Sequence, residues 1–197
     1  MPNKRLNLRD IVVISFISAV LGVLYLLWVL LGQMVTGIFG PVGGGLMAGF
    51  WILAPVVCAY IVQKPGAAML AELIAAGTEV MAGSVSAGAV LVLGFTQGLA
   101  AEIIFALFFY RVFRLPVLML AGMAGTFAAF LTQYVLYGFS QYAGSVVVFM
   151  LITMLISGAL LAGWAGKSFT DALVKTGVLD RFALGRQYRL EQQRDTV

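Results

Sequence analysis

Three glutamates lie within long apolar stretches of this 197-residue sequence: Glu72, Glu79 and Glu102. A carboxyl group is costly to place inside a lipid bilayer, so such a residue faces the protein interior or a wet cavity and is a functional candidate. The same apolar stretches contain no Lys or Arg that could neutralise the three groups. Either the carboxyl groups are protonated, because burial disfavours the charged form, or a cation from outside the chain pairs with them.

The spacing of the glutamates predicts where each one lies. Glu72 and Glu79 are seven residues apart, so in a helix they share a face and are separated by about 10 Å along the axis. Such a pair cannot hold one point charge but can contact two ends of an elongated ligand, with Glu79 nearer the outside. On the next helix, Gln97 is expected near mid-membrane and Glu102 in the inner half. The alternative is that Glu72 and Glu102 are protonated packing residues that hydrogen-bond neighbouring helices.

Aromatic residues and glutamines gather near the expected outer ends of the helices. The candidates for ligand contact are Phe39, Trp51, Gln133, Tyr134 and Tyr142. An aromatic belt at the membrane surface explains any one of these rings. Aromatic faces beside a carboxylate also suit an aromatic organic cation, through stacking and cation–π attraction, and glutamines suit the polar edge of a heterocycle. Both interpretations stay open from the residues alone.

The residue types that are missing exclude several chemistries. The sequence has no His and a single cysteine, Cys58, which predicts no metal site and no intrachain disulfide. No glycine-rich phosphate-binding loop of the P-loop type is present, so ATP chemistry would belong to partner chains. We therefore expect a protein that is not an enzyme and that uses no cofactor. The isoelectric point near 9.4 does not indicate nucleic-acid binding, because the basic residues lie at the ends of apolar segments.

The composition predicts an all-α integral membrane protein that positions these residues. Hydrophobic residues make up 62% of the chain and charged residues 10%, with a mean hydropathy of +1.03, whereas a soluble domain is about half apolar and about a quarter charged. A membrane-spanning helix needs about 20 mostly apolar residues. Six transmembrane helices are predicted: 11–31, 46–63, 66–82, 88–110, 116–138 and 145–166.

All 12 Lys and Arg residues fall on one side of the six predicted spans. They lie before the first span, between the second and third, between the fourth and fifth, and after the sixth. Because cytoplasmic loops are enriched in Lys and Arg, this side is predicted to be the cytoplasm. The chain then divides into a cytoplasmic N-terminus (1–10), a six-helix membrane domain (11–166) and a cytoplasmic amphipathic tail (167–197).

The first outer connection, 32–45, reads GQMVTGIFGPVGGG. It is too apolar for a solvated loop, and we expect it to be too rich in glycine for a stable helix. One interpretation is a lid that folds over the outer mouth of the protein, with the glycines as hinges. The other is an apolar connector lying in the headgroup region of the bilayer.

Small residues four positions apart in the first span favour the close approach of another helix. Ser15 and Ala19 form one such pair, and Ser18 and Gly22 form a second. We predict that these two pairs dock the chain onto a partner membrane protein.

Several motifs, in order over nearly the whole chain, resemble the YkoE family. They are FGP at 39–41, KPGAA at 64–68, the pair Glu72 and Glu79, QG-x3-E at 97–102, LPVLMLAGM at 115–123, ISGALLAG at 156–163, and the TGVL and ALG elements at 176–179 and 183–185. YkoE proteins are substrate-binding (S) components of energy-coupling-factor (ECF) vitamin transporters. The resemblance implies a six-helix fold and, as partners, ATPase subunits and a transmembrane coupling subunit. It also implies that the ligand is thiamin or its hydroxymethylpyrimidine precursor.

Two functional classes remain open at this point. The first is a vitamin-binding transporter subunit. Thiamin is an elongated cation with a thiazolium and an aminopyrimidine, which suits two carboxylates and several aromatic rings. The second is a membrane scaffold or accessory subunit without a small ligand, in which the buried acids are protonated contacts between helices.

Overall fold

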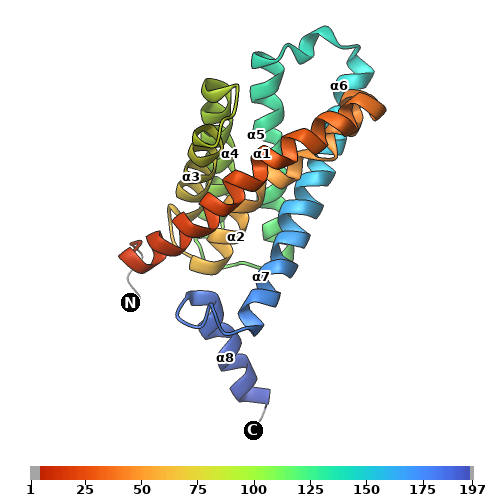
Figure 1. Ribbon diagram of the computed structural model, residues 1–197. Coiled ribbons are helices and arrows are strands. Elements are labelled where there is room, and N and C mark those ends of the chain that lie inside the picture. The colour runs from red at the N-terminus through yellow and green to blue at the C-terminus, as the bar shows by residue number, and fades with distance from the viewer. Residues whose placement is uncertain (1–4, 196–197) are drawn as a thin grey trace.

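The computed structural model describes residues 5–195 and is helical with short connections over that range (Figure 1). The order of its elements is α1 (Leu8–Gly45), η1 (Ala48–Ile52), α2 (Leu53–Val62), α3 (Ala67–Met81), α4 (Ala87–Leu107), α5 (Leu115–Leu136), η2 (Phe139–Gln141), α6 (Gly144–Ser157), η3 (Gly158–Ala165), α7 (Gly166–Lys175) and α8 (Ala183–Asp195). The predicted all-α class is confirmed.

Four helical stretches of the described chain are long and apolar enough to cross a bilayer: Leu8–Gly45, Ala87–Leu107, Leu115–Leu136 and Gly144–Lys175. The second and third predicted spans are shorter in the structure. The apolar helix Ala48–Val62 begins as a 3-10 turn, and α3 has 15 residues. A helix of that length covers about 22 Å, against about 30 Å of hydrocarbon in a bilayer. Six complete crossings therefore stay a prediction.

The segment 32–45 is helical, and the expectation that its glycines prevent a helix was wrong. Helix α1 runs on to Gly45 and is interrupted only at Gly40, where φ is 70° and Pro41 follows. Contacts with the rest of the bundle stabilise this weak helix. The Thr153 hydroxyl of α6 donates to the Val42 carbonyl at 3.1 Å. Helix stability in proteins comes mostly from tertiary packing rather than from intrinsic propensity, so glycine content alone misled the prediction.

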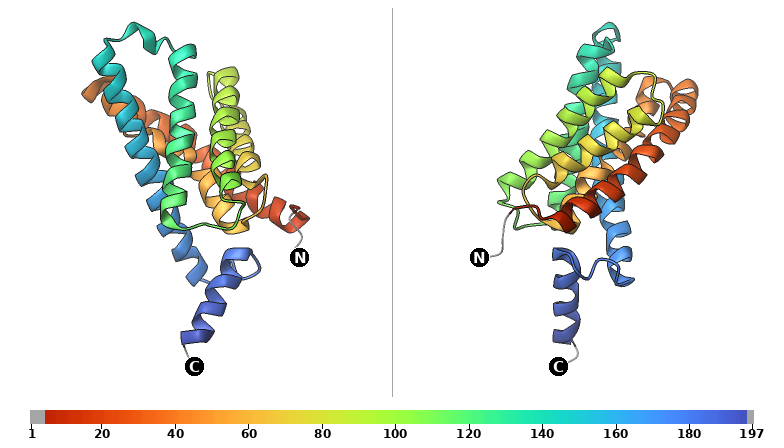
Figure 2. Two further views of the ribbon diagram at one scale, coloured as in Figure 1. Left: turned by 180° about the vertical axis from the view of Figure 1, so that it is seen from behind. Right: turned by 60° about the vertical axis from the view of Figure 1, so that its left-hand side comes forward.

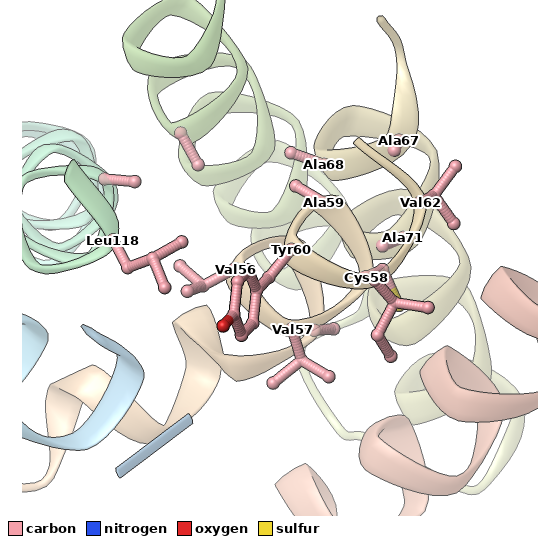
Figure 3. Close-up of a cluster of buried hydrophobic side chains, with 14 of the residues drawn as sticks. Val56, Val57, Cys58, Ala59, Tyr60, Val62, Ala67, Ala68, Ala71 and Leu118 are labelled. Atoms are coloured by element: carbon pink, nitrogen blue, oxygen red, sulfur yellow. The ribbon is translucent and has the colours of Figure 1, made fainter. Parts of the chain in front are cut away.

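Helix α2 is the centre of the hydrophobic core. Every residue from Ala54 to Val62 is buried, and its side chains meet α3 residues such as Ala68 and Ala71 and the α5 residue Leu118 (Figure 3). A helix that is apolar on all sides is expected to be surrounded by others. This burial explains how a short helix keeps its place among longer ones.

Both described ends of the chain lie toward the same end of the bundle, and α7 and α8 project beyond it (Figures 1 and 2). Lys64, between α2 and α3, forms a 2.6 Å ion pair with Asp10 at the start of α1. The Tyr60 hydroxyl donates to Asp171 of α7 at 2.8 Å, and Gln63 exchanges side-chain hydrogen bonds with Gln187 of α8. Helix Gly144–Lys175 runs without interruption through residue 167, so the change to polar sequence there is not a break in the helix.

The two small-residue pairs of α1 have different surroundings. Ser18 and Gly22 are buried inside the protein, where a Cβ on Gly22 would overlap the Ala75 carbonyl of α3. That pair packs helices of this chain together and is not free to dock a partner, so this part of the docking prediction was wrong. Ser15 and Ala19 are partly exposed, and docking through them stays a prediction.

Candidate functional site

A cavity of about 700 Å³, here called the glutamate cavity, lies between α1, η1 and α3 to α6. Its described lining contains no Lys or Arg. The polar, aromatic and sulfur-bearing residues that line it are Tyr25, Gln33, Thr36, Trp51, Glu72, Glu79, Gln97, Gln133, Tyr137, Phe139, Tyr142, Met47, Met150 and Met154. A concave, mostly apolar space with a few convergent polar groups is the usual form of a small-molecule site.

Glu72 has the most constrained environment of the acids in this cavity. Its side chain is 2% exposed, and its Oε2 atom has no hydrogen-bond partner among the described residues. The Tyr25 side chain is a hydrogen-bond partner of the Glu72 carboxyl group. The Tyr25 hydroxyl oxygen also accepts a hydrogen bond from the Ala54 amide at 2.9 Å. A buried polar atom left unpaired costs about 1–3 kcal/mol. Glu72 is therefore positioned by Tyr25 and left with one oxygen for a donor that the chain does not supply.

Small residues on α4 bring that helix against Glu72. A Cβ on Gly98 would lie 2.9 Å from the Glu72 Cβ, and one on Gly94 would lie 2.5 Å from the Ala76 Cβ. Neither position has room for a larger side chain. This close contact places Gln97, which is also buried, at the wall of the cavity.

Glu79 lies two helical turns along α3 from Glu72 and is also buried. Its carboxyl group forms no hydrogen bond or ion pair with any residue in the described range 5–195, and Tyr137 is near enough to interact with it electrostatically. The cavity thus contains two acids on one helix face and no cation in its described lining. Its electrostatics favour a ligand that carries positive charge or hydrogen-bond donors.

Six of the nine predicted ligand contacts line the glutamate cavity: Glu72, Glu79, Gln97, Trp51, Gln133 and Tyr142. Phe39 and Tyr134 do not. Phe39 is 70% exposed on α1, and Tyr134 is 40% exposed with its ring against Phe130 at 6.2 Å. The structure therefore does not bring these two rings to the cavity, because proximity to the outer end of a helix does not decide which way a side chain points.

Glu102 is also outside the lining of this cavity, so the structure does not bring it together with the other predicted ligand contacts. One carboxylate oxygen accepts the Gly66 amide at 2.6 Å and the Tyr110 hydroxyl at 2.7 Å. The other accepts the amides of Ala68 and Met69 at 2.9 and 3.1 Å. The first amides of a helix have no partner within it, so a side-chain acceptor stabilises the start of α3. Glu102 thus joins α4 to the start of α3 and to the loop after α4 through these four hydrogen bonds.

Tyr25 is a site residue that the sequence predictions left out. It is 1% exposed and contacts Glu72 from the middle of the first apolar stretch. The signal was present, because a buried tyrosine needs a partner for its hydroxyl and Glu72 was already a candidate. No comparable indication in the sequence pointed to three other residues of the lining, Thr36, Met150 and Met154. Among the described side chains of residues 5–194, no three His, Cys, Asp or Glu come together as a metal site.

The fold and the cavity together define an α-helical protein of the membrane class with room for a small ligand. Residues 9–128 match a family model described as the permease component of the ABC-type cobalt transport system. The chain is 41% identical over 191 residues to the HMP/thiamine permease protein YkoE of Bacillus subtilis (strain 168), covering 97% of this chain and 96% of that one.

A crystal structure of an S-component of an ECF transporter has the same fold. Its TM-score is 0.94 at 40% identity, with 98% of each chain covered. The chain belongs to the YkoE family of membrane transport proteins. The predicted family is therefore confirmed.

Proposed function

We propose that this protein is the substrate-binding subunit of an ECF importer and that it holds thiamin in the glutamate cavity. The observation that carries the proposal is the unpaired, buried Oε2 of Glu72 in a cavity whose described lining has no cation. The relative named an HMP/thiamine permease and the S-component structure support the same assignment. In a scaffold that binds no ligand, the cavity would stay empty and the buried Glu72 oxygen would stay unpaired. An unpaired buried polar group lowers the stability of the folded protein.

The two acids suit the two ends of thiamin. The aminopyrimidine carries an exocyclic amino group that can donate to Glu72, and the cationic thiazolium can lie toward Glu79. Trp51, Tyr137 and Tyr142 supply aromatic faces at the same cavity. Hydroxymethylpyrimidine is the second candidate, favoured by the name of the relative. It would contact Glu72 but is too short to reach Glu79 as well.

In this proposal, transport needs other chains. The sequence carries no P-loop, so ATP hydrolysis is assigned to partner ATPase subunits. A transmembrane coupling subunit then transmits the conformational change of the ATPase subunits to this substrate-binding subunit. The subunit lies in the plasma membrane of a prokaryote with six crossings and both ends in the cytoplasm. The gathering of basic residues at the end that carries both termini supports that orientation.

Titration calorimetry of detergent-purified variants tests the site. Glu72→Gln is expected to weaken binding of both thiamin and hydroxymethylpyrimidine by about ten- to hundred-fold, because a hydrogen bond to a charged group contributes about 1.5–3 kcal/mol. Glu79→Gln should weaken thiamin binding by a similar factor and leave hydroxymethylpyrimidine binding within about twofold.

Glu191→Gln is the matched control, because this exposed glutamate lies outside the glutamate cavity. Its thiamin affinity should equal that of the wild type. If both cavity variants bind thiamin as tightly as the wild type, the glutamate cavity is not the site. If wild-type protein binds neither compound, the scaffold function is the better account.

A further inference from the structure

A second cavity, here called the basic cavity, lies at the other end of the molecule between the membrane bundle and α7 and α8. It has a volume of about 830 Å³. Four basic side chains line it (Arg111, Arg114, Lys167 and Lys175), against two acidic ones (Asp171 and Glu191). The glutamate cavity collects acids without cations, whereas this one collects cations in excess of acids. The two therefore suit ligands of opposite charge.

The excess positive charge is not used within the described chain. Lys167 pairs with Asp171, which also accepts the Tyr60 hydroxyl. Arg111, Arg114 and Lys175 form no ion pair or side-chain hydrogen bond with any residue from 5 to 194. These three residues belong to the cavity lining and are exposed, and their charged groups have no partner among residues 5–194.

The loop that carries the two arginines has a defined conformation. Phe109 and Tyr110 both have positive φ, at 54° and 55°, which is costly for residues other than glycine and persists only where the surroundings hold it. The Tyr110 hydroxyl is held by Glu102 at 2.7 Å, and the ring of Phe113 is stacked on Phe105 at 5.3 Å. The loop is therefore anchored on both sides of Arg111.

We propose that the basic cavity binds a phosphate-bearing anion through Arg111, Arg114 and Lys175. Arginine presents planar donors that match phosphate oxygens, and lysine adds a point charge. Apolar walls from Val112, Leu115 and Leu184 lie beside these groups. The anion is either the headgroup of an anionic phospholipid, which the position at a bilayer surface favours, or a soluble phosphate compound that enters from the same side.

Native mass spectrometry of the full chain in neutral detergent separates the two sources. We expect wild-type protein to retain phosphatidylglycerol in preference to phosphatidylcholine if the source is a lipid. It should instead bind pyrophosphate, measured by calorimetry, if the source is a soluble anion. Either result supports the anion site. Binding of neither phosphatidylglycerol nor pyrophosphate overturns it.

The double variant Arg111→Gln/Arg114→Gln should lower the affinity for the bound anion at least about tenfold, since each arginine contributes a charge-assisted hydrogen bond. Arg181→Gln is the control, because this exposed arginine is near the same end but outside the cavity. Its affinity should stay within about twofold of the wild type. Equal losses in both proteins, at unchanged helical content by circular dichroism, would show a nonspecific effect of net charge and overturn the proposal.

Chemical modification of lysines in the wild-type chain provides a test that does not depend on how the variants fold. Acetylation of Lys175, followed by mass spectrometry, should fall at least about threefold when the bound anion is present. Lys64, which pairs with Asp10 away from the cavity, should be modified equally with and without it. Equal modification of Lys175 in both conditions contradicts the site.

Discussion

At the scale of single residues, three glutamates in apolar helices have two different roles that their positions in the sequence do not distinguish. Glu72 and Glu79 face a cavity, whereas Glu102 accepts four hydrogen bonds at the start of α3. The spacing of Glu72 and Glu79 predicted a shared helix face correctly. The role of Glu102 depends on backbone amides more than thirty residues earlier, and their proximity follows from how α3 and α4 pack.

Replacing Glu102 should destabilise the protein rather than its ligand complex. Glu102→Ala leaves three amides of the α3 start and the Tyr110 hydroxyl without their acceptor. We expect the free energy of unfolding to fall by about 2–4 kcal/mol, from the loss of a helix cap and of bonds to a charged group. Denaturation in detergent measures the loss, and thiamin titration of the folded fraction should give the wild-type affinity. An unchanged unfolding free energy would show that the cap is dispensable.

At the scale of helices, the apolar runs predicted α4 and α5 to within a few residues. Helix α5 begins at Leu115, and Pro116 lies in its first turn, where the missing amide is harmless. The failures all involve tertiary contact. The glycine-rich end of α1 is helical and is bonded to α6. The short helix α2 is enclosed by its neighbours. Those contacts join residues far apart in the sequence, so no local pattern carried them.

The crossing of α5 with η3 depends on glycine at the contact. Gly122 and Gly158 meet backbone to backbone, and a Cβ on Gly122 would overlap the Gly158 carbonyl oxygen. The π-helical turn η3 begins at this contact. We expect Gly122→Ala to lower the free energy of unfolding by about 1–3 kcal/mol, the usual cost of overpacking.

Gly77→Ala is the matched control, because nothing lies within 4 Å of a Cβ built on this α3 glycine. That substitution should stabilise the helix by about 0.5–1 kcal/mol. Thermal unfolding of the two variants in the same detergent compares them directly. An unchanged or stabilised Gly122→Ala protein would mean that the close contact at Gly122 does not limit packing.

At the scale of the whole molecule, the one-sided distribution of Lys and Arg corresponds to a physical end of the bundle. Lys64 pairs with Asp10 at the start of α1, and Arg111, Arg114, Lys167 and Lys175 line the basic cavity beside α8. The glutamate cavity contains no Lys or Arg in its described lining. The sequence thus predicted the charge polarity of the fold from loop composition alone. The number of complete membrane crossings could not be predicted as well from the sequence. The rule that a crossing helix needs about 20 residues applies to helices in contact with lipid, and it does not apply to short helices enclosed by other helices.

Cysteine labelling in intact cells tests which end faces the cytoplasm. In a Cys58→Ala background, Val85→Cys places a thiol on a fully exposed residue between α3 and α4, and Val112→Cys places one in the loop between α4 and α5. Because positively charged loops are retained in the cytoplasm, a membrane-impermeant maleimide should label the Val85→Cys protein in intact cells. The Val112→Cys protein should react only after permeabilisation. Labelling of the Val112→Cys protein from outside would invert the proposed orientation, and with it the side from which the glutamate cavity is loaded.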